Sequence, residues 1–407
     1  MLGYGPGAYL TRRTGDIPDT IVNSQRPVRR TACFKANPTA ATEPSRRIQP
    51  MKKICMLLQK AKLALILSLF FAIAATSPPA VTLRVAAEPH HILLGSAAAS
   101  SFLTETEYAN ILGSEFSQLQ AENEMKFGII HPRPDSDPKP YDFRGGDALV
   151  AFAQAHNMAV RGHTLVWHNR LSPWVKDGSY SSPQLSQILH GHIDTVMKHY
   201  ASKVYAWDVV NEAFNDDGTM RHTIWYDQPG IGSGAGTAYL EQVFRWARVA
   251  DPTAKLFYND YDAEEINTKS DAIYAMAKDF KKRGVPLDGI GFQTHITLKF
   301  DDPEKLKSYA QNLQRFADLG LELHMTELDI RLTDSSPASL AEQAKLYGEI
   351  TSLCILQPHC KLLQTWGFTD KHSWIPAFYK GLGWALLWDE GYRKKPAYAA
   401  MREALLK

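Results

Sequence analysis

The segment VYAWDVVNEAF (residues 204–214) is a short apolar run that ends in an amide and a carboxylate, Asn211 and Glu212. Its length and its valines are typical of a buried strand. A carboxylate buried without a partner costs several kcal/mol, and Lys and Arg are scarce around this one. The segment therefore predicts a core strand whose carboxyl end presents polar groups to something other than an ion-pair partner.

Similar short apolar runs recur along the chain, which predicts a repeating strand–helix fold. Helical patterns with one apolar face lie between several of the apolar runs, and two of them begin with the capping pairs Ser182-Pro183 and Asp302-Pro303. The eight predicted strands are residues 93–98, 116–120, 159–166, 204–210, 255–259, 289–294, 321–327 and 361–367.

Alternating strands and helices favour a parallel sheet with right-handed crossovers. Eight such units in about 320 residues predict an α/β fold, a single closed (β/α)8 TIM barrel. A doubly wound open sheet is the alternative, and it is weakened because no glycine-rich fingerprint follows the first predicted strand. Residues 88–407 contain no linker or low-complexity stretch, so we expect them to form one domain.

The first 80 residues differ from this body. They contain 12 Lys or Arg and 3 Asp or Glu, so residues 81–407 carry a net charge of −7 against +2 for the whole chain. Residues 51–80 start with Met51, contain four lysines, and continue into a mostly apolar run over 63–75, then small residues and two prolines. This layout predicts a secretory signal peptide rather than a membrane anchor, which needs roughly 20 apolar residues.

Residues 1–50 precede this predicted signal peptide. They are rich in Arg, Pro and Thr and have no amphipathic period, so we interpret them as a mis-assigned extension upstream of a start at Met51, or as a disordered extension. We expect a secreted protein, extracellular or periplasmic, with no stable membrane association after signal cleavage. Its mildly acidic body lacks the electrostatic footprint of a nucleic-acid partner.

Two cysteines lie in the body, Cys354 and Cys360, and an oxidising compartment favours a disulfide between them. Two thiols alone are a poor metal site, and we expect no metal or cofactor.

Polar and aromatic side chains follow almost every predicted strand. They are Glu122, Asn123, Glu124, Lys126, His163, Trp167, His168, Asn211, Glu212, Asn259, Asp260, Tyr261, Gln293, Thr294, His295, Glu327, Asp329, Trp366 and Asp370. In a barrel these strand ends form one face, and barrel enzymes place their chemistry there. Carboxylates walled by indoles suit a carbohydrate, because sugar faces stack on Trp while sugar hydroxyls bond to amides and carboxylates.

Two carboxylates on different strands are the minimum equipment for glycoside hydrolysis, one to protonate the leaving oxygen and one to attack or to activate water. Glu212 and Glu327 are the best pair, since both end apolar strands. The alternative for either residue is a core carboxylate in an ion pair.

At these residues the sequence resembles glycoside hydrolase family 10, the endo-β-1,4-xylanases, over roughly residues 90–405. Each of seven motifs is weak alone, but their common order makes chance agreement very improbable. They are ENEMK (122–126), RGHTLVWH (161–168), WDVVNEAF (207–214), FYNDYD (257–262), GIGFQTHI (289–296), HMTELDIR (324–331) and TWGFTDKHSWIP (365–376). Phe127 departs from the family, which usually has Trp there.

The resemblance implies a retaining double displacement, with Glu212 as general acid/base and Glu327 as nucleophile, their carboxyls about 5–5.5 Å apart. Asn211 would hold the 2-hydroxyl of the sugar being cleaved. His295 would hydrogen-bond Glu327, and Asp329 would orient the His295 ring. We further expect the charge of Glu327 to raise the pKa of Glu212.

The resemblance also implies the substrate-binding residues Glu122, Asn123, Lys126, His163, Trp167 and Gln293, with Trp366 and Trp374 as wall and lid. The partners it implies are xylan and xylo-oligosaccharides, and we expect a monomer. A disulfide like that predicted for Cys354 and Cys360 occurs in part of the family.

Three other functions remain as alternatives. The histidines His163, His168, His295 and His324 raise a metal-dependent barrel hydrolase, although two of them are five residues apart and point to opposite faces of a strand. A non-catalytic sugar-binding barrel would keep the tryptophans but lose a carboxylate, and both carboxylates are present. Another β-1,4-glycanase of the same barrel clan, such as a cellulase, would share the Asn-Glu pair and Glu327.

Overall fold

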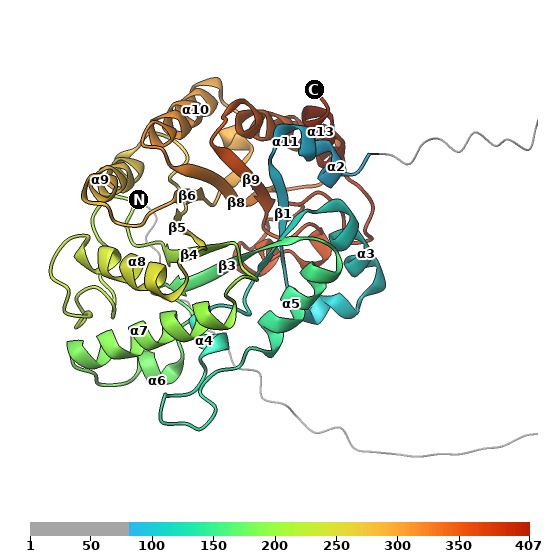
Figure 1. Cartoon of the computed structure of the whole chain (residues 1–407). Coiled ribbons are helices and arrows are strands. Elements are labelled where there is room, and N and C mark those ends of the chain that lie inside the picture. Colours follow the sequence, from blue (N-terminus) through green and yellow to red (C-terminus); the bar gives the residue numbers. More distant parts are fainter. Residues whose placement is uncertain (1–80) are drawn as a thin grey trace, which may run out of the picture. The chain divides into compact units, whose positions relative to one another are not determined.

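Eight parallel strands close into a barrel in the computed structural model, which describes residues 81–407 (Figure 1). Each strand pairs with the next, and the last strand pairs with the first through Leu93–Leu362 to Ser96–Thr365. The barrel strands are β1 (Leu93–Ala98), β2 (Gln118–Ala121), β3 (Ala159–Val166), β4 (Ala206–Asn211), β5 (Lys255–Asp260), β6 (Gly289–Phe292), β8 (Glu322–Arg331) and β9 (Cys360–Thr365). The predicted TIM barrel is confirmed.

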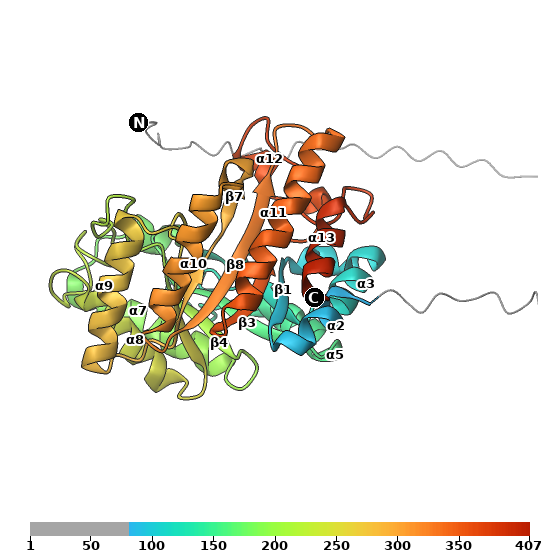
Figure 2. The same cartoon turned by 90° about the horizontal axis from the view of Figure 1, so that it is seen from above.

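A helix follows each barrel strand and packs on the outside of the barrel (Figure 1). These helices are α3 (Thr106–Glu115), α5 (Arg144–Ala155), α7 (Ser182–His199), α8 (Ala238–Ala250), α9 (Thr268–Arg283), α10 (Pro303–Ala317), α11 (Pro337–Leu356) and α13 (Pro396–Leu405). Figure 2 shows α13 beside α11 and α2. The shorter helices are α2 (Leu83–Ala87), α4 (Phe127–Ile130), α6 (Pro173–Lys176) and α12 (Ile375–Phe378), with 3-10 turns η1 (Glu88–His90), η2 (Ser100–Thr104), η3 (Leu298–Phe300) and η4 (Asp370–His372).

The chain divides into two units, Met1–Thr76 and Ser77–Lys407, and all described residues belong to the second. The predicted extension over 1–50 and the predicted signal peptide over 51–80 lie outside the described residues. Within 81–407, none of the helices has the length and apolar character needed to cross a membrane.

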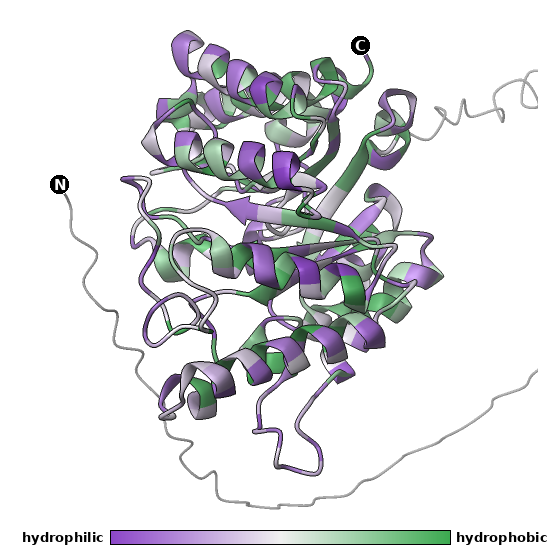
Figure 3. Cartoon of the chain, turned by 60° about the vertical axis from the view of Figure 1, so that its left-hand side comes forward, coloured by the Kyte–Doolittle hydropathy of each residue, from purple (hydrophilic) through white to green (hydrophobic). Residues whose placement is uncertain are grey.

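Local sequence explains where the outer helices begin and end. Asp302 caps α10 by accepting a hydrogen bond from the backbone N–H of Glu304, and Pro303 supplies a first-turn φ that suits a helix. Gly284 ends α9 in the left-handed conformation, with φ +66°. Hydrophobic and hydrophilic stretches alternate along the helices in Figure 3, as expected for helices with one face on a barrel.

The inside of the barrel is partly polar and is held by a buried ion pair. Arg161 of β3 forms two hydrogen bonds to Asp208 of β4 and a third, of 2.7 Å, to Gln120 of β2. None of the three side chains reaches solvent. Because a buried charge needs both a partner and complete hydrogen bonding, these residues tie three adjacent strands in one register.

A ninth strand extends the sheet beyond the barrel. The three residues of β7 (His295–Thr297) pair with the outer end of β8, with His295 opposite Asp329. The strand predicted over 321–327 therefore ends four residues later than the sequence pattern indicated, since its polar end continues in extended pairing. This extension brings the segment that follows β6 into contact with the outer end of β8.

A disulfide joins Cys354, near the end of α11, to Cys360, the first residue of β9, with 5.3 Å between their Cα atoms. Replacing both cysteines by alanine should lower the free energy of unfolding by about 2 kcal/mol, because the short closed loop no longer restricts the unfolded chain. We expect the melting temperature to fall by a few degrees. Calorimetry with and without a reductant checks this: the reductant should act on the wild type and leave the double variant unchanged.

Candidate active site

The side chain of Glu212 lies just beyond the end of β4, among three N–H donors. The Trp167 indole donates to its Oε2 at 2.9 Å, and the Asn211 and Gln293 amides both donate to its Oε1 at 3.0 Å. These donors come from the ends of three different strands. They hold one carboxylate in a fixed orientation.

The pKa of Glu212 corrects an expectation. Burial alone would raise it, but the hydrogen bonds from Gln293 and Trp167 and nearby positive charge outweigh burial and lower the pKa below its usual value. The sequence-based prediction that the charge of Glu327 raises the pKa of Glu212 is therefore wrong in its direction. In the free protein the donors favour the ionised carboxylate.

Glu327 is buried within β8 and has two partners. The Asn259 amide donates to its Oε1 at 2.8 Å, and His295 Nε2 lies 3.1 Å from its Oε2. The other ring nitrogen, Nδ1, lies 2.8 Å from Asp329, which also accepts the Trp374 indole N–H at 2.9 Å. The five side chains thus form a continuous hydrogen-bonded chain.

The electrostatics of His295 determine its protonation. Burial by itself lowers its pKa, but the carboxylates of Asp329 and Glu327 more than compensate and raise the pKa to about 10. The imidazolium therefore donates both N–H groups, one to each carboxylate. The positive charge on this ring is thus in direct contact with the carboxylate of Glu327.

An amide array connects the two glutamates. The side-chain oxygen of Asn211 accepts from Asn259 at 2.9 Å and from Gln293 at 3.2 Å. Asn259 donates to Glu327, whereas Gln293 donates to Glu212. The predicted pair therefore faces one shared group of amides on neighbouring strands.

Sequence reasoning placed Asn259 at a strand end but gave it no role. Its amide is completely buried, and its oxygen accepts from the Thr326 hydroxyl at 2.7 Å. In the sheet Asn259 stands opposite Asn211 on the adjacent strand. That parallel register is the signal that predicts the contact, once the strands are aligned by their polar ends.

A second cluster of predicted residues surrounds Lys126. Its ammonium lies 5.3 Å from the ring centroid of Trp167 and 5.5 Å from that of Trp366, and it donates to Asn123 Oδ1 at 3.1 Å. Asn123 in turn donates to Glu122 at 3.2 Å. Burial raises the pKa of Glu122 and lowers that of Lys126. This cluster combines two indole walls with polar groups that suit hydroxyl ligands.

His163 connects this cluster to the barrel interior. Its Nδ1 lies 2.9 Å from Asp208, the partner of Arg161, and its ring meets Trp366 edge-on with 5.4 Å between centroids. Burial opposes ionisation of Asp208, but Arg161 and His163 together lower its pKa. The orientation of His163 is therefore set from below by the buried ion pair.

The four histidines of the metal alternative have separate surroundings. His163 and His295 bond to carboxylates as described, and His324 stacks on Phe257 with centroids 4.0 Å apart. Burial lowers the pKa of His168 and of His324 to about 4. In the part of the chain that the structure describes, no three His, Cys, Asp or Glu side chains gather in a group that could hold a metal ion.

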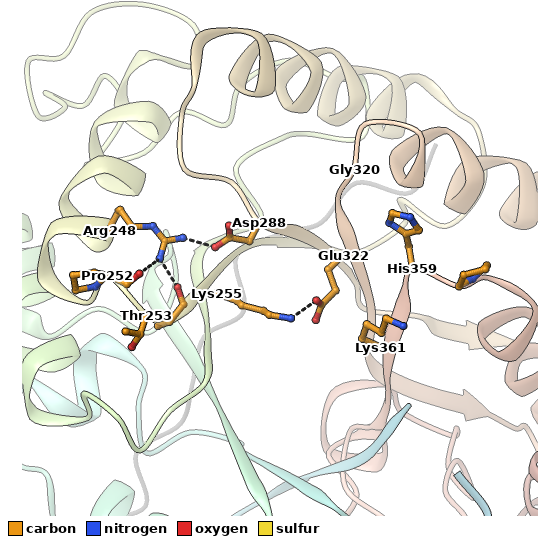
Figure 4. A pocket seen from close by; sticks show the side chains of 11 residues that line it. Arg248, Pro252, Thr253, Lys255, Asp288, Gly320, Glu322, His359 and Lys361 are labelled. Atoms are coloured by element: carbon orange, nitrogen blue, oxygen red, sulfur yellow. Dashed lines mark hydrogen bonds and ion pairs between the residues drawn. The ribbon is translucent and has the colours of Figure 1, made fainter. Parts of the chain in front are cut away.

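A cavity of about 550 Å³ lies elsewhere, at the amino-terminal ends of the strands (Figure 4). Lys255, the first residue of β5, pairs there with Glu322, the first residue of β8, and Arg248 pairs with Asp288. Because Asn259 and Glu327 stand further along these strands, this cavity is separate from the candidate site.

Comparison with known proteins identifies the family. A profile of Glycosyl hydrolase family 10 matches residues 82–404. The chain is similar to endo-1,4-beta-xylanase B of Thermotoga neapolitana, with 43% identity over 347 residues, 84% of this chain and 96% of the relative. It is also similar to endo-1,4-beta-xylanase C of Phanerodontia chrysosporium, with 39% identity over 311 residues, 75% of this chain and 74% of the relative.

Two solved structures agree with this result. The native xylanase 10B of Thermotoga maritima aligns with a TM-score of 0.75 at 44% identity, covering 80% of this chain and 98% of the other. The xylanase 10B of Thermotoga petrophila in complex with xylobiose aligns with a TM-score of 0.75 at 43% identity, covering 81% and 98%. With its barrel closed and both glutamates on one array of amides, the chain belongs to glycosyl hydrolase family 10.

Proposed function

We propose that the protein is a secreted endo-1,4-β-xylanase that cuts internal bonds of xylan with retention, using Glu212 as acid/base and Glu327 as nucleophile. The observation that carries this proposal is the amide array that joins the two carboxylates through Asn211. The xylanases among the relatives support the substrate class. The charge and apolar layout of residues 51–80 supports export.

In the first step an oxygen of Glu327 attacks the anomeric carbon. The bond from that carbon to the leaving oxygen breaks, and Glu212 gives its proton to that oxygen, so a glycosyl ester of Glu327 and a free chain end result. The Asn259 amide and the charged His295 ring hold the Glu327 carboxylate in a fixed orientation before the attack.

In the second step a water molecule gives its proton to Glu212 and its oxygen attacks the same carbon. The ester bond breaks, Glu327 becomes a carboxylate again, and the sugar leaves with its original β configuration. Glu212 is ionised at this stage, which is the form that Gln293 and Trp167 favour.

The first step needs Glu212 in its neutral form, and this proton must come with the substrate bound. A sugar that covers the site excludes water and brings an oxygen acceptor to the carboxyl group, and both effects favour the protonated acid. Burial already acts in this direction on Glu212. The hydrogen-bond donors around Glu212 therefore favour its ionised form, whereas the bound substrate favours its protonated form.

The remaining site residues bind the sugars on the non-reducing side of the cut. The amides of Asn211 and Asn123 and the charged groups of Glu122 and Lys126 offer donors and acceptors for hydroxyls. The indoles of Trp167, Trp366 and Trp374 supply apolar walls for sugar faces. Gln293 and His163 complete the set.

Substitution of Glu327 by alanine should reduce the hydrolysis of xylo-oligosaccharides at least a thousandfold, an order-of-magnitude figure for removing a covalent nucleophile. Chromatography of the products over time measures the loss. Glu322→Gln is a matched control, because Glu322 is on the same strand but at its opposite end, and it should retain most activity. Retained turnover in Glu327→Ala would rule out Glu327 as the attacking group.

Replacement of Gln293 by methionine should move the alkaline limb of the kcat/KM pH profile to higher pH. The donor that lowers the pKa of Glu212 is lost, so the acid form persists to higher pH. The acidic limb should stay in place and serves as an internal control. An alkaline limb that is unmoved, or that moves to lower pH, would show that Gln293 does not set the proton affinity of Glu212.

A further inference from the structure

Glu212 has an unusual backbone conformation. Its φ is +57°, in the left-handed region that side chains other than glycine seldom adopt. Such a conformation is unfavourable for a residue with a side chain and persists only where its surroundings hold it. The groups that hold the peptides around Glu212 therefore also determine where its carboxylate points.

Three hydrogen bonds fix the backbone on both sides of Glu212. Its N–H donates to the Asn259 carbonyl at 3.0 Å, and its carbonyl accepts from Arg221 Nε at 3.1 Å. The N–H of the next residue, Ala213, donates to the Tyr258 hydroxyl at 2.9 Å. Both peptide groups of Glu212 are thus anchored, one by β5 and one by Arg221 together with a buried phenol.

The Tyr258 hydroxyl is itself the end of a buried chain. It donates to Asp260 Oδ2, and Asp260 Oδ1 pairs with the ammonium of Lys269 at 2.9 Å. Tyr258, Asp260 and Lys269 are each at most 1% exposed. The lysine is the second residue of α9, so the chain runs from that helix through β5 to the peptide after Glu212.

Tyr261 links this chain to Arg221. The Lys269 ammonium lies 3.3 Å from the centroid of the Tyr261 ring, and the Tyr261 hydroxyl accepts from Arg221 at 3.0 Å. Arg221 also donates to the Phe214 carbonyl at 3.1 Å. The two anchors of Glu212 therefore belong to one cluster.

Alternation along β5 separates this cluster from the nucleophile. Asn259 points to Glu327, whereas its neighbours Tyr258 and Asp260 point to the other side of the strand. Tyr258 packs there against Phe214 with 5.9 Å between centroids. The chain is thus connected to the backbone of Glu212 and has no contact with Glu327.

Stability alone is a poor explanation for a buried Lys–Asp pair, because desolvation offsets most of the attraction between the charges. Burial first, and the charge of Glu212 in addition, raise the pKa of Asp260 to about 6, against the opposing effect of Lys269. The burial of the Lys269–Asp260 pair is explained if the pair holds the Tyr258 hydroxyl in place.

We propose that Tyr258, Asp260 and Lys269, with Arg221, are positioning residues for the proton transfers of Glu212. They keep the carboxyl group where it can give a proton to the leaving oxygen and later take one from water. The attack by Glu327 does not depend on them. This inference rests on the acid/base role proposed above for Glu212.

Leaving-group dependence tests the proposal. Tyr258→Phe keeps the ring and removes the hydroxyl that accepts from Ala213. Its kcat/KM should fall about 10- to 100-fold on xylotetraose, whose departing sugar needs a proton, in line with the effect of small misplacements of reacting groups. On 2,4-dinitrophenyl β-xylobioside, whose leaving group needs none, kcat/KM should fall less than about threefold. Azide should restore part of the lost kcat on the aryl substrate, because it attacks the glycosyl ester without a base.

Two further variants keep the test decisive. Arg221→Gln removes the other anchor at a partly exposed site and should show the same contrast between substrates, which covers the case that Tyr258→Phe folds poorly. Tyr347→Phe is the matched control. It loses a buried hydroxyl that donates to the Ala385 carbonyl at 2.7 Å, and any loss should be equal on both substrates.

Glu212→Ala separates a failure of this inference from a failure of the proposed function. If Glu212→Ala shows strong leaving-group dependence and azide rescue while Tyr258→Phe and Arg221→Gln lose activity equally on both substrates, or lose none, the positioning role is overturned. If Glu212→Ala itself shows neither behaviour, the acid/base assignment is wrong and the positioning role falls with it.

Discussion

All eight strands of the barrel run in the same direction, and this constraint puts the side chains of the candidate site at one rim. Closure between β9 and β1 means that no strand end is far from the others. Glu327 lies more than 100 residues beyond Asn211 and Glu212 in the chain. The Asn259 amide nevertheless donates to both Glu327 and Asn211, and the Gln293 amide donates to both Asn211 and Glu212. The buried pair Arg161–Asp208 maintains the register beneath them.

The sequence predicted the architecture because its strong signals are local. The apolar runs at 93–98 and 159–166 correspond to β1 and β3 without any shift. The outer part of β8 and the whole of β7 were missed, since Asp329 and Arg331 make that stretch look like a loop. Pairing between His295 and Asp329 is a non-local interaction, and no pattern within either segment shows it.

For the candidate site, residue types at strand ends predicted that His295 and Asp329 lie near Glu327. Trp374 and the roles of these residues came only from the family resemblance, and Asn259 was given no role. The pKa of Glu212 was harder to predict from the sequence. The direction of the pKa of Glu212 depends on whether Gln293 and Trp167 point their N–H groups at it, which is a matter of rotamers. The left-handed backbone conformation of Glu212 could not be predicted either, because a glutamate, unlike a glycine, does not indicate a positive φ.

The cavity lined by Arg248 and Glu322 lies at the end of the barrel opposite the candidate site, and the two ends differ in how well they tolerate substitution. At the amino-terminal end, charged pairs are partly exposed and can be exchanged for other surface chemistry with small energetic effect. At the rim that carries the candidate site, the amides of Asn259 and Gln293 each donate to two residues, so a single replacement there disturbs several contacts. Adaptation to heat or salt therefore has room to accumulate beneath the barrel while the chemistry above it is unaffected.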